Sequence, residues 1–404
     1  MNLRLQLMID YYAGGMLHVL LKPLVLLMGK LLRRNHDLKR CSTVTIVKML
    51  GGGSLVIAYP ALLAIKNAPH VKKLQLLTTP AVQPFAATLA IFDSIILVRT
   101  DSPVRLVLDS VRAIRLLFLC DAIVDLEVHS RLTTVFSVIS CARNRIGFYT
   151  RNSFWRRQLA THLLFCNLTA GIYHYYDQIA ALFGGKLPHA AECRERFRAA
   201  IGAPALPEPS SVPRIALSPC CSDLSKERML RPEEWVVALR RRLSRDGEAP
   251  LATEIHLFGA PRDRASLDEL GNLLRRELPR ITPVNHAGQT SLLESVRQMA
   301  RLDELLCIDS ALLHFGRLLG MPTTSFWGPT DPQTLLRPWP GIREEIHYQK
   351  LPCSPCVHLA DDAPCRGNNI CMRLAVDPDR AEDRNPAWVV ADESVTRFTR
   401  VSGP

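Results

Sequence analysis

The chain has 404 residues, of which 48% are hydrophobic and 22% are charged. This length exceeds what one hydrophobic core usually supports, so we expect two domains, and the composition excludes an intrinsically disordered chain. The formal net charge of +12 predicts an anionic partner, such as a phosphate-bearing substrate or an anionic lipid. Nucleic acid is not expected, because the sequence lacks zinc-finger spacing, a basic-aromatic RNA motif and a helix-turn-helix pattern.

The first 40 residues form a segment of their own. Residues 16–32 are largely apolar but contain Lys22, Pro23 and Lys30, and a basic cluster follows between residues 33 and 40. A spanning helix needs about 20 predominantly apolar residues, and a signal peptide places its charges before its apolar run. We therefore expect an interfacial, membrane-associated helix with its basic end on anionic headgroups. The alternative is a helix packed on the protein's own core.

From residue 41 the pattern alternates between short apolar strands and helices, which predicts parallel βαβ units. Strands are expected at residues 44–47, 74–78, 95–98, 122–126, 214–217 and 255–258, and helices at 55–68, 104–119, 235–243, 265–278 and 291–300. Residues 201–213 contain four prolines and are typical of a linker. The predicted organisation is a first Rossmann-like domain at 41–200, the linker at 201–213, a second Rossmann-like domain at 214–345, and a cysteine-bearing segment with the C-terminal tail at 346–404.

Polar residues gather where predicted strands end. Asp309 and Ser310 follow an apolar strand and begin a helix that carries His314. Ligands of open α/β sheets bind outside the carboxyl ends of the strands, and a helix N-terminus there favours an anionic group. In the first half, Gly51-Gly52-Gly53-Ser54 forms a strand-to-helix turn that is neither a Walker loop nor a dinucleotide-binding fingerprint.

A second polar group follows the strand predicted at residues 122–126. Asp125 and Glu127 should lie on the same face of that strand, because side chains alternate along a strand. Glu127 is the first candidate for a general base, with His129 as the other. For Asp125, a local ion pair with Arg131 is as well supported as a functional role.

Twelve cysteines fall into two groups. Eight are scattered, several of them in apolar stretches, as is typical of free thiols in a reducing cytoplasm. The other four lie close together as a C-x-x-C pair and two neighbours: Cys353, Cys356, Cys365 and Cys371. This spacing fits a tetrahedral structural site for zinc or iron, a C-terminal cysteine knuckle. A metal-free cluster of thiols is the alternative.

Two stretches carry a resemblance to a known family. One is Gly51-Gly52-Gly53-Ser54 with Tyr59-Pro60-Ala61-Leu62 behind it, and the other runs from Asp309-Ser310 to Gly328-Pro329-Thr330-Asp331-Pro332. Together they resemble glycosyltransferase family 9, the ADP-heptose:lipopolysaccharide heptosyltransferase family. Ser54 stands where the heptosyltransferases normally carry an aspartate, thought to be the general base. The sequence is therefore similar to a branch that has Gly-Ser here and a cysteine-bearing tail.

The resemblance implies two Rossmann-like domains that face each other across a cleft, as in GT-B glycosyltransferases. It implies an inverting, metal-independent sugar transfer from a nucleotide sugar, with ADP-heptose the first candidate, to a lipopolysaccharide core or another lipid-linked saccharide. The expected location is the cytoplasmic face of the bacterial inner membrane. No cofactor is expected for the chemistry. Because a serine cannot act as a base at neutral pH without help, Glu127 and then His129 are the candidate bases, beside Ser54.

The resemblance also places the donor site in the second domain. The residues expected to bind the donor are Ser222, Lys226, Arg228, Gly259, Gly288, Thr290, Asp309, Ser310 and His314. Hydroxyls and a cation among them would neutralise the charge on the departing diphosphate. Ordinary roles are open for some of them, such as a helix N-cap at Thr290 or Ser291. Two other functions also stay open: a donor-binding scaffold that has lost catalysis, and a redox protein that holds an iron–sulfur cluster on the four cysteines.

Overall fold

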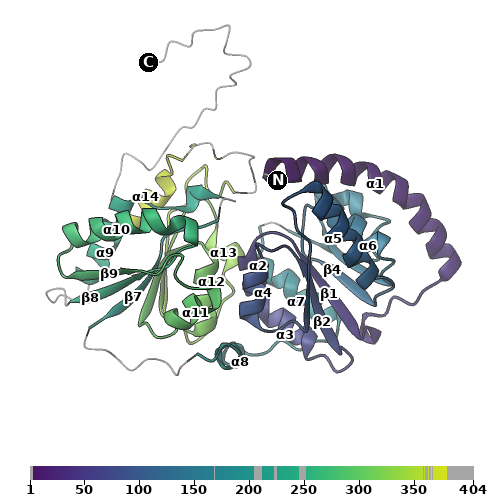
Figure 1. The fold of residues 1–404 in the computed structure, drawn as a ribbon, viewed down its shortest axis with the longest axis horizontal. Coiled ribbons are helices and arrows are strands. Elements are labelled where there is room, and N and C mark those ends of the chain that lie inside the picture. Colours follow the sequence, from purple (N-terminus) through teal and green to yellow (C-terminus); the bar gives the residue numbers. More distant parts are fainter. Residues whose placement is uncertain are drawn as a thin grey trace, which may run out of the picture. The chain divides into compact units, whose positions relative to one another are not determined.

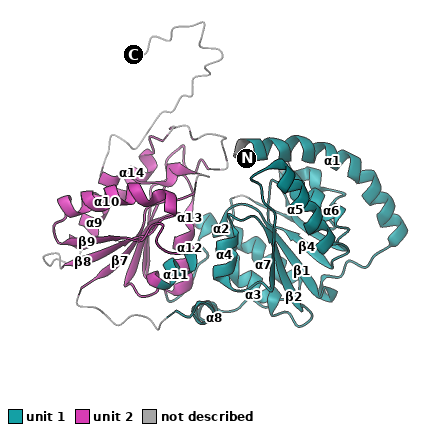
Figure 2. Cartoon of the chain, in the orientation of Figure 1, with its two compact units in different colours: residues 1–205, 291–297, 333–341 teal, residues 206–290, 298–332, 342–404 magenta. Residues whose placement is uncertain are grey.

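The computed structural model describes residues 3–379 apart from 168, 204–211, 223–224, 245–251, 358, 360–362, 364 and 366. The chain divides into two compact units, which Figures 1 and 2 show. Unit 1 contains residues 1–205 with two short later segments, 291–297 and 333–341, and unit 2 contains the rest. Most of the expected linker, 201–213, lies outside the described residues.

Unit 1 is built on a six-stranded parallel sheet in the order β3-β2-β1-β4-β5-β6. Its strands are β1 (Thr43–Lys48), β2 (Lys73–Thr78), β3 (Ser94–Leu97), β4 (Ala122–Asp125), β5 (Asn144–Tyr149) and β6 (His162–Phe165). Its helices are α1 (Leu3–Leu32), α2 (Gly52–Ile57), α3 (Tyr59–Lys66), α4 (Gln83–Leu89), α5 (Pro103–Leu116), α6 (Arg131–Ile139), α7 (Ile172–Leu182) and α8 (Ala190–Ile201). The long helix α1 is prominent in Figure 1.

Unit 2 has a second six-stranded parallel sheet, in the order β12-β11-β10-β7-β8-β9. Its strands are β7 (Arg214–Ser218), β8 (Thr253–Leu257), β9 (Ile281–Asn285), β10 (Glu304–Ile308), β11 (Thr323–Trp327) and β12 (Glu344–Tyr348). Its helices are α9 (Pro232–Ser244), α10 (Arg264–Glu277), α12 (Ala311–Leu319) and α14 (Ile370–Val376), while α11 (Leu292–Met299) and α13 (Pro332–Leu335) lie across the division between the units.

Both sheets have a point where the strand order reverses. In unit 1 the chain builds β2 and β3 on one side of β1 and then β4 on the other; in unit 2 it builds β8 and β9 beside β7 and then β10 on the opposite side. The central strands are buried along their length, as expected for sheets covered on both faces. The β1/β4 and β7/β10 junctions are therefore the two places where such sheets bind ligands.

The expected α/β class with two parallel sheets is confirmed, but the predicted helix at residues 55–68 is wrong in detail. It is two helices, α2 and α3, which meet at Ala58. Pro60 lies in the first turn of α3, where its missing N–H leaves no helical hydrogen bond unmade. That the two domains face each other across a cleft stays a prediction.

Candidate active site

In unit 1 the turn after β1 is held by the carboxylate of Glu127, which follows β4. Oε1 of Glu127 accepts hydrogen bonds from the backbone N–H groups of Met49 (2.7 Å) and Leu50 (2.9 Å) and from Nζ of Lys48 (3.1 Å). The Lys48 and Glu127 side chains are only 9% and 13% exposed. The turn continues into Gly51, whose φ of +72° is a conformation that glycine adopts without strain. Glu127 thus lies at the β1/β4 junction.

Ser54 lies in the first turns of α2, with its hydroxyl near the hydroxyl of Tyr176 on α7. Tyr176 is buried, and burial together with the nearby Glu127 carboxylate raises the pKa of its phenol well above the ordinary value. The phenol is therefore protonated at neutral pH. Sequence reasoning missed Tyr176, which lies in a helix that was not predicted. It also missed Lys48, although a lysine that ends a buried apolar strand was a usable signal.

Asp125 belongs to the interior of unit 1. Its Oδ2 accepts hydrogen bonds from Nη2 of Arg156 (2.9 Å) and from Oγ1 of Thr133 (2.8 Å), and the Arg156 side chain is 1% exposed. Burial raises the pKa of Asp125, and the charge of Arg156 opposes that rise. The alternative of an ion pair with Arg131 is wrong: Asp125 pairs with Arg156, and Nη1 of Arg131 donates to the carbonyl of Tyr11 on α1.

The expectation that Asp125 and Glu127 share one face of a strand was also wrong. β4 ends at Asp125, so side-chain alternation does not extend to Glu127. Asp125 is 4% exposed, whereas Glu127 lies in the loop and reaches the turn after β1. His129, two residues further on, is exposed.

In unit 2 an ion pair joins three loops at the carboxyl edge of the sheet. Nη1 of Arg228 donates to the backbone oxygen of Asp309 (3.1 Å) and to its Oδ2 (3.3 Å), which also accepts from Oγ1 of Thr330 (2.8 Å). Nε of Arg228 donates to the carbonyl of Ser225 (3.1 Å). Asp309 is 4% exposed, and the Arg228 side chain is 15% exposed. The guanidinium is therefore fixed in place at the edge of the sheet.

Ser310 and His314 occupy the start of α12. Ser310 is the N-cap residue, and its Oγ lies 3.5 Å from Oγ of Ser218, the last residue of β7. The two serines thus meet at the β7/β10 junction. His314 is 6% exposed, and burial lowers its pKa to about 4, so its ring is neutral at pH 7. Among the residues described, Nδ1 of His314 has no hydrogen-bond partner.

The remaining expected donor residues lie in loops that follow β7, β8 and β9. Ser222 and Lys226 are exposed. Gly259 follows β8, and Gly288, with φ of +70°, follows β9. A Cβ added to Gly288 would lie 3.1 Å from Cα of Pro261, so the loops after β8 and β9 approach each other closely.

The prediction that Thr290 or Ser291 caps a helix is confirmed for Ser291. Oγ of Ser291 accepts from the backbone N–H of Glu294 (3.3 Å), and Oε2 of Glu294 accepts from the backbone N–H of Ser291 (2.8 Å). This reciprocal pair is a capping box at the start of α11. Thr290 precedes it in the loop after β9.

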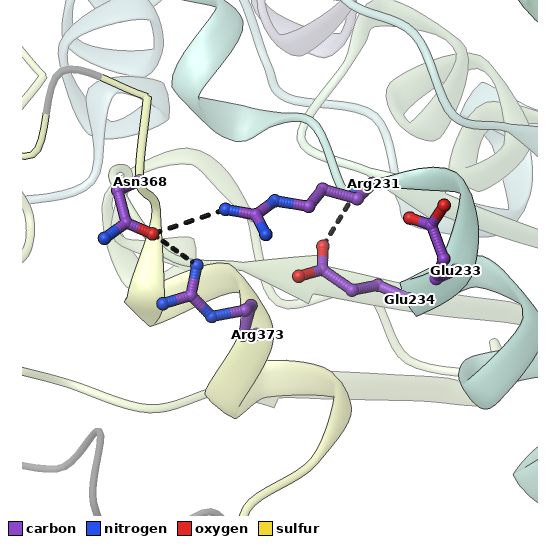
Figure 3. A pocket seen from close by; sticks show the side chains of 5 residues that line it. All are labelled: Arg231, Glu233, Glu234, Asn368 and Arg373. Carbon is purple, nitrogen blue, oxygen red and sulfur yellow. Dashed lines mark hydrogen bonds between the residues drawn. The ribbon is translucent and has the colours of Figure 1, made fainter.

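A pocket of about 460 Å³ lies near the starts of α9 and α14, and Figure 3 shows the side chains that line it. It is lined by Arg231, Glu233, Glu234, Asn368 and Arg373. Oδ1 of Asn368 accepts from Nη2 of Arg231 (3.3 Å) and Nη1 of Arg373 (2.7 Å), and Oε2 of Glu234 accepts from the backbone N–H of Arg231 (2.7 Å). The hydrogen bonds through Asn368 therefore link the start of α9 to α14.

The four expected metal ligands, Cys353, Cys356, Cys365 and Cys371, line a single cavity of about 10 Å³ beside Glu227 and Asn369. Burial raises the pKa of Cys356 to about 11 and that of Cys371 to about 12, and the neighbouring thiols add to both shifts. Within the described residues, no three His, Cys, Asp or Glu side chains are arranged to hold a metal ion. The structure therefore gathers the four thiols without placing them in coordination geometry.

A family of known proteins matches the part of the chain that contains the loops of unit 2. Residues 190–365 match the profile of Glycosyltransferase family 9 (heptosyltransferase). Over 79 residues the chain is 34% identical to lipooligosaccharide heptosyltransferase 2 of Haemophilus influenzae, a match that covers 20% of this chain and 22% of that protein. These matches support glycosyltransferase family 9 as the family of this chain, on the strength of residues 190–365.

Solved structures of this family share the fold. The ADP-heptose LPS heptosyltransferase II of E. coli is 14% identical, with a TM-score of 0.56 over 82% of this chain and 98% of that one. E. coli heptosyltransferase WaaC with ADP is 16% identical, with a TM-score of 0.57 over 75% of this chain and 93% of that one. A family 9 glycosyltransferase of Veillonella parvula is 15% identical, with a TM-score of 0.56 over 77% and 87%. The expected GT-B type of fold, with a Rossmann-like sheet in each unit, is thereby confirmed.

Proposed function

We propose that this family 9 chain is an inverting glycosyltransferase that moves a heptose from ADP-heptose to a lipopolysaccharide core or another lipid-linked saccharide. The family match covers residues 190–365, which include the loops at the β7/β10 junction. Structures of the similar WaaC contain ADP and ADP-2-deoxy-2-fluoro heptose, which supports an ADP-linked sugar as the donor. The proposed location is the cytoplasmic face of the inner membrane.

The observation that carries the proposal is the fixed cation in unit 2. Arg228 is held by Asp309 and Ser225, and the N-terminus of α12 begins beside Asp309. A guanidinium and a helix N-terminus at one edge would stabilise the negative charge that develops on a departing diphosphate. In this account Arg228 and Ser310 contact the diphosphate, and Asp309 and Thr330 position Arg228. The loops that carry Ser222, Lys226, Gly259, Gly288, Thr290 and His314 surround the donor.

On the acceptor side we assign the general base to Glu127. Within the described residues its carboxylate accepts three hydrogen bonds, all at Oε1, and these fix the orientation of the carboxylate. Oε2 is then the atom that would remove a proton from the acceptor hydroxyl. Ser54, which lies near the hydroxyl of Tyr176, would position that acceptor hydroxyl. The exposed His129 is the second candidate for the base.

Calorimetric titration with ADP tests the donor site. Arg228→Ala should weaken ADP binding about tenfold or more, because hydrogen bonds to charged groups contribute about 1.5–3 kcal/mol each. Arg276→Ala is the matched control, since Arg276 lies on α10 and its side chain is 73% exposed. Equal affinity for ADP in the parent and the Arg228 variant would remove Arg228 from the site.

We propose a separate structural role for the four cysteines: they bind one zinc or iron ion, and the sulfurs move together as the ion binds. Support comes from the C-x-x-C spacing and from the one small cavity that all four line. Cys371 lies in α14 and Cys353 in the preceding loop, so an ion here would tie this loop to unit 2. No step of the sugar transfer depends on it.

A further inference from the structure

Helix α1 contacts the rest of unit 1 through polar and small residues. Asp10, Gly14 and His18 recur every four residues and so lie on one face of the helix. Oδ1 of Asp10 accepts from Oγ of Ser130 (2.6 Å) and from the backbone N–H of Leu132 (2.9 Å), at the N-terminus of α6. A Cβ at Gly14 would lie 2.6 Å from Cβ of Arg131, so only glycine permits this close approach of α1 to α6.

His18 extends the same contact. Its Nε2–H donates to the carbonyl of Arg131 (3.1 Å), and its ring stacks on Trp155 with the centroids 4.5 Å apart. Burial lowers the pKa of His18 to about 4, so the stacked ring is neutral at pH 7. A polar stripe, Asp10-Gly14-His18, therefore fixes α1 along α6.

The other faces of α1 are apolar and exposed. Its most exposed large side chains are Val19 (73%), Tyr12 (69%) and Leu31 (68%), and the further ones are Leu5, Leu7, Met8, Tyr11, Met16, Leu20, Leu24, Leu26, Leu27, Met28 and Leu32. A surface helix of a globular protein normally turns its apolar stripe toward the core. α1 does the reverse: it buries the polar stripe and presents its leucines outward.

Helix α5 also exposes an apolar face. Val104, Val107, Leu108 and Val111 follow helical spacing and are 43–68% exposed. On its other side, Leu106, Ala113 and Ile114 pack on the core of unit 1, and Oδ2 of the buried Asp109 lies 2.8 Å from Nε of Arg99. Both α1 and α5 pack against α6, and Figure 1 shows all three helices in unit 1. The apolar faces of two separate helices are thus exposed on one unit.

Basic residues flank both apolar faces. Arg105, Arg112 and Arg115 are exposed on α5, and Lys30 and Arg33 are exposed at the end of α1. Large exposed apolar patches mark sites of protein or membrane interaction. A lipid interface favours apolar faces bordered by Lys and Arg, because the charges contact anionic headgroups while the apolar side chains enter the acyl boundary. The charges therefore favour a lipid surface as the occupant.

We propose that α1 and α5 together form a membrane-binding face on which unit 1 rests on anionic lipid, with α1 in the plane of the interface. α1 alone is long and apolar enough to cross a membrane by length and composition. Crossing would, however, withdraw Asp10 from the N-terminus of α6 and His18 from Trp155. This inference rests on unit 1 and does not depend on the proposed sugar transfer.

Vesicle flotation of the full chain tests the face. The parent should bind vesicles of phosphatidylethanolamine and phosphatidylglycerol, and bind phosphatidylcholine vesicles more weakly. The triple variant Val107→Ser, Leu108→Ser and Val111→Ser should lower the partition coefficient about tenfold or more, since each buried aliphatic side chain contributes to transfer from water. Its melting temperature should stay parental, because the three side chains are exposed. The matched control is Val284→Ser with Ile346→Ser, two exposed apolar residues of unit 2, which should bind as the parent does.

If the α5 triple variant bound vesicles as tightly as the parent, α5 would have no role in membrane binding. If the parent chain itself failed to bind vesicles, the membrane-binding face would be excluded and a protein partner favoured. A second measurement tests the orientation of α1. With an epitope tag at the N-terminus and sealed inner-membrane vesicles, the tag should be digested by protease from the same side as unit 2. A protected tag would show that α1 spans the membrane.

Discussion

Glu127 and Asp125 are two residues apart in the chain and have different surroundings. Asp125 is buried against Arg156, while Glu127 holds the turn after β1. The sequence predicted that both carboxylates lie near the end of a strand, because that follows from local pattern alone. It could not predict which one is buried, since Arg156 comes from a segment 31 residues away. The proximity of Ser54 to Tyr176 and the ion pair of Arg228 with Asp309 could not be predicted either, because each joins residues that are far apart in the chain.

The role of Glu127 leads to the first kinetic prediction. Glu127→Gln should lower the turnover number about 10²–10⁴-fold, the usual contribution of a general base, while ADP affinity stays nearly parental. The glutamine amide oxygen can still accept from the N–H groups of Met49 and Leu50, so the turn should persist. Transfer rates measured across pH, with Ser54→Ala as a milder comparison, check this. Parental turnover in the glutamine variant would exclude Glu127 and direct the search to His129.

His314 should make the stability of unit 2 depend on pH. Its folded-state pKa of about 4 lies below the ordinary value of about 6.5, so the unfolded chain binds more protons between these values. The contribution is complete above about pH 6.5 and is lost as the pH falls toward 4. In calorimetry, His314→Leu should show a smaller fall in melting temperature from pH 7 to pH 5 than the parent. An identical fall in both proteins would mean that His314 is not the titrating group.

At the scale of elements, the two edge strands of unit 2 were not predicted from sequence. β9 contains Pro283 and β12 begins with two glutamates, and both strands lie at the edges of their sheet, where such residues are tolerated. Local pattern argues against a strand in each case. α5 was predicted as a helix, but its second, exposed apolar face was not, because the usual rule places apolar side chains inside.

Deletion of residues 1–38 should release the protein from lipid and leave both units folded. Unit 1 should lose stability, because Asp10 caps α6 and the loss of a helix N-cap costs about 0.5–2 kcal/mol. Urea unfolding followed by circular dichroism measures the loss, and ADP binding by unit 2 should stay parental. An insoluble, unfolded product would show instead that α1 is a core helix.

The cysteine segment makes a separate prediction about metal content. Elemental analysis of the purified chain should find about one zinc or iron ion per molecule, and Cys353→Ser should lose it together with part of the thermal stability. Cys141→Ser is the control, since Cys141 lies in unit 1 away from the cavity. Visible absorbance would identify an iron–sulfur cluster. A parent protein that contains no metal, and whose melting temperature does not change with chelators, would show that the four cysteines form a metal-free thiol cluster.

At the scale of the whole molecule, the predicted donor residues all lie in unit 2, most of them in loops that follow its strands. They could be placed from sequence because the carboxyl ends of parallel strands share one edge of a sheet, whatever the distance between them along the chain. The inward polar stripe of α1 was not predicted, since it depends on the N-terminus of α6 more than a hundred residues later.

The most direct test is sugar transfer itself, from ADP-heptose to a lipopolysaccharide-core acceptor, with ADP release and the anomeric configuration of the product measured together. The proposal predicts acceptor-dependent ADP release and a product of inverted configuration, with activity strongly reduced in Arg228→Ala and in Glu127→Gln and retained in Arg276→Ala. Tight ADP-heptose binding without transfer to any lipid-linked saccharide would contradict the proposal and indicate a donor-binding scaffold.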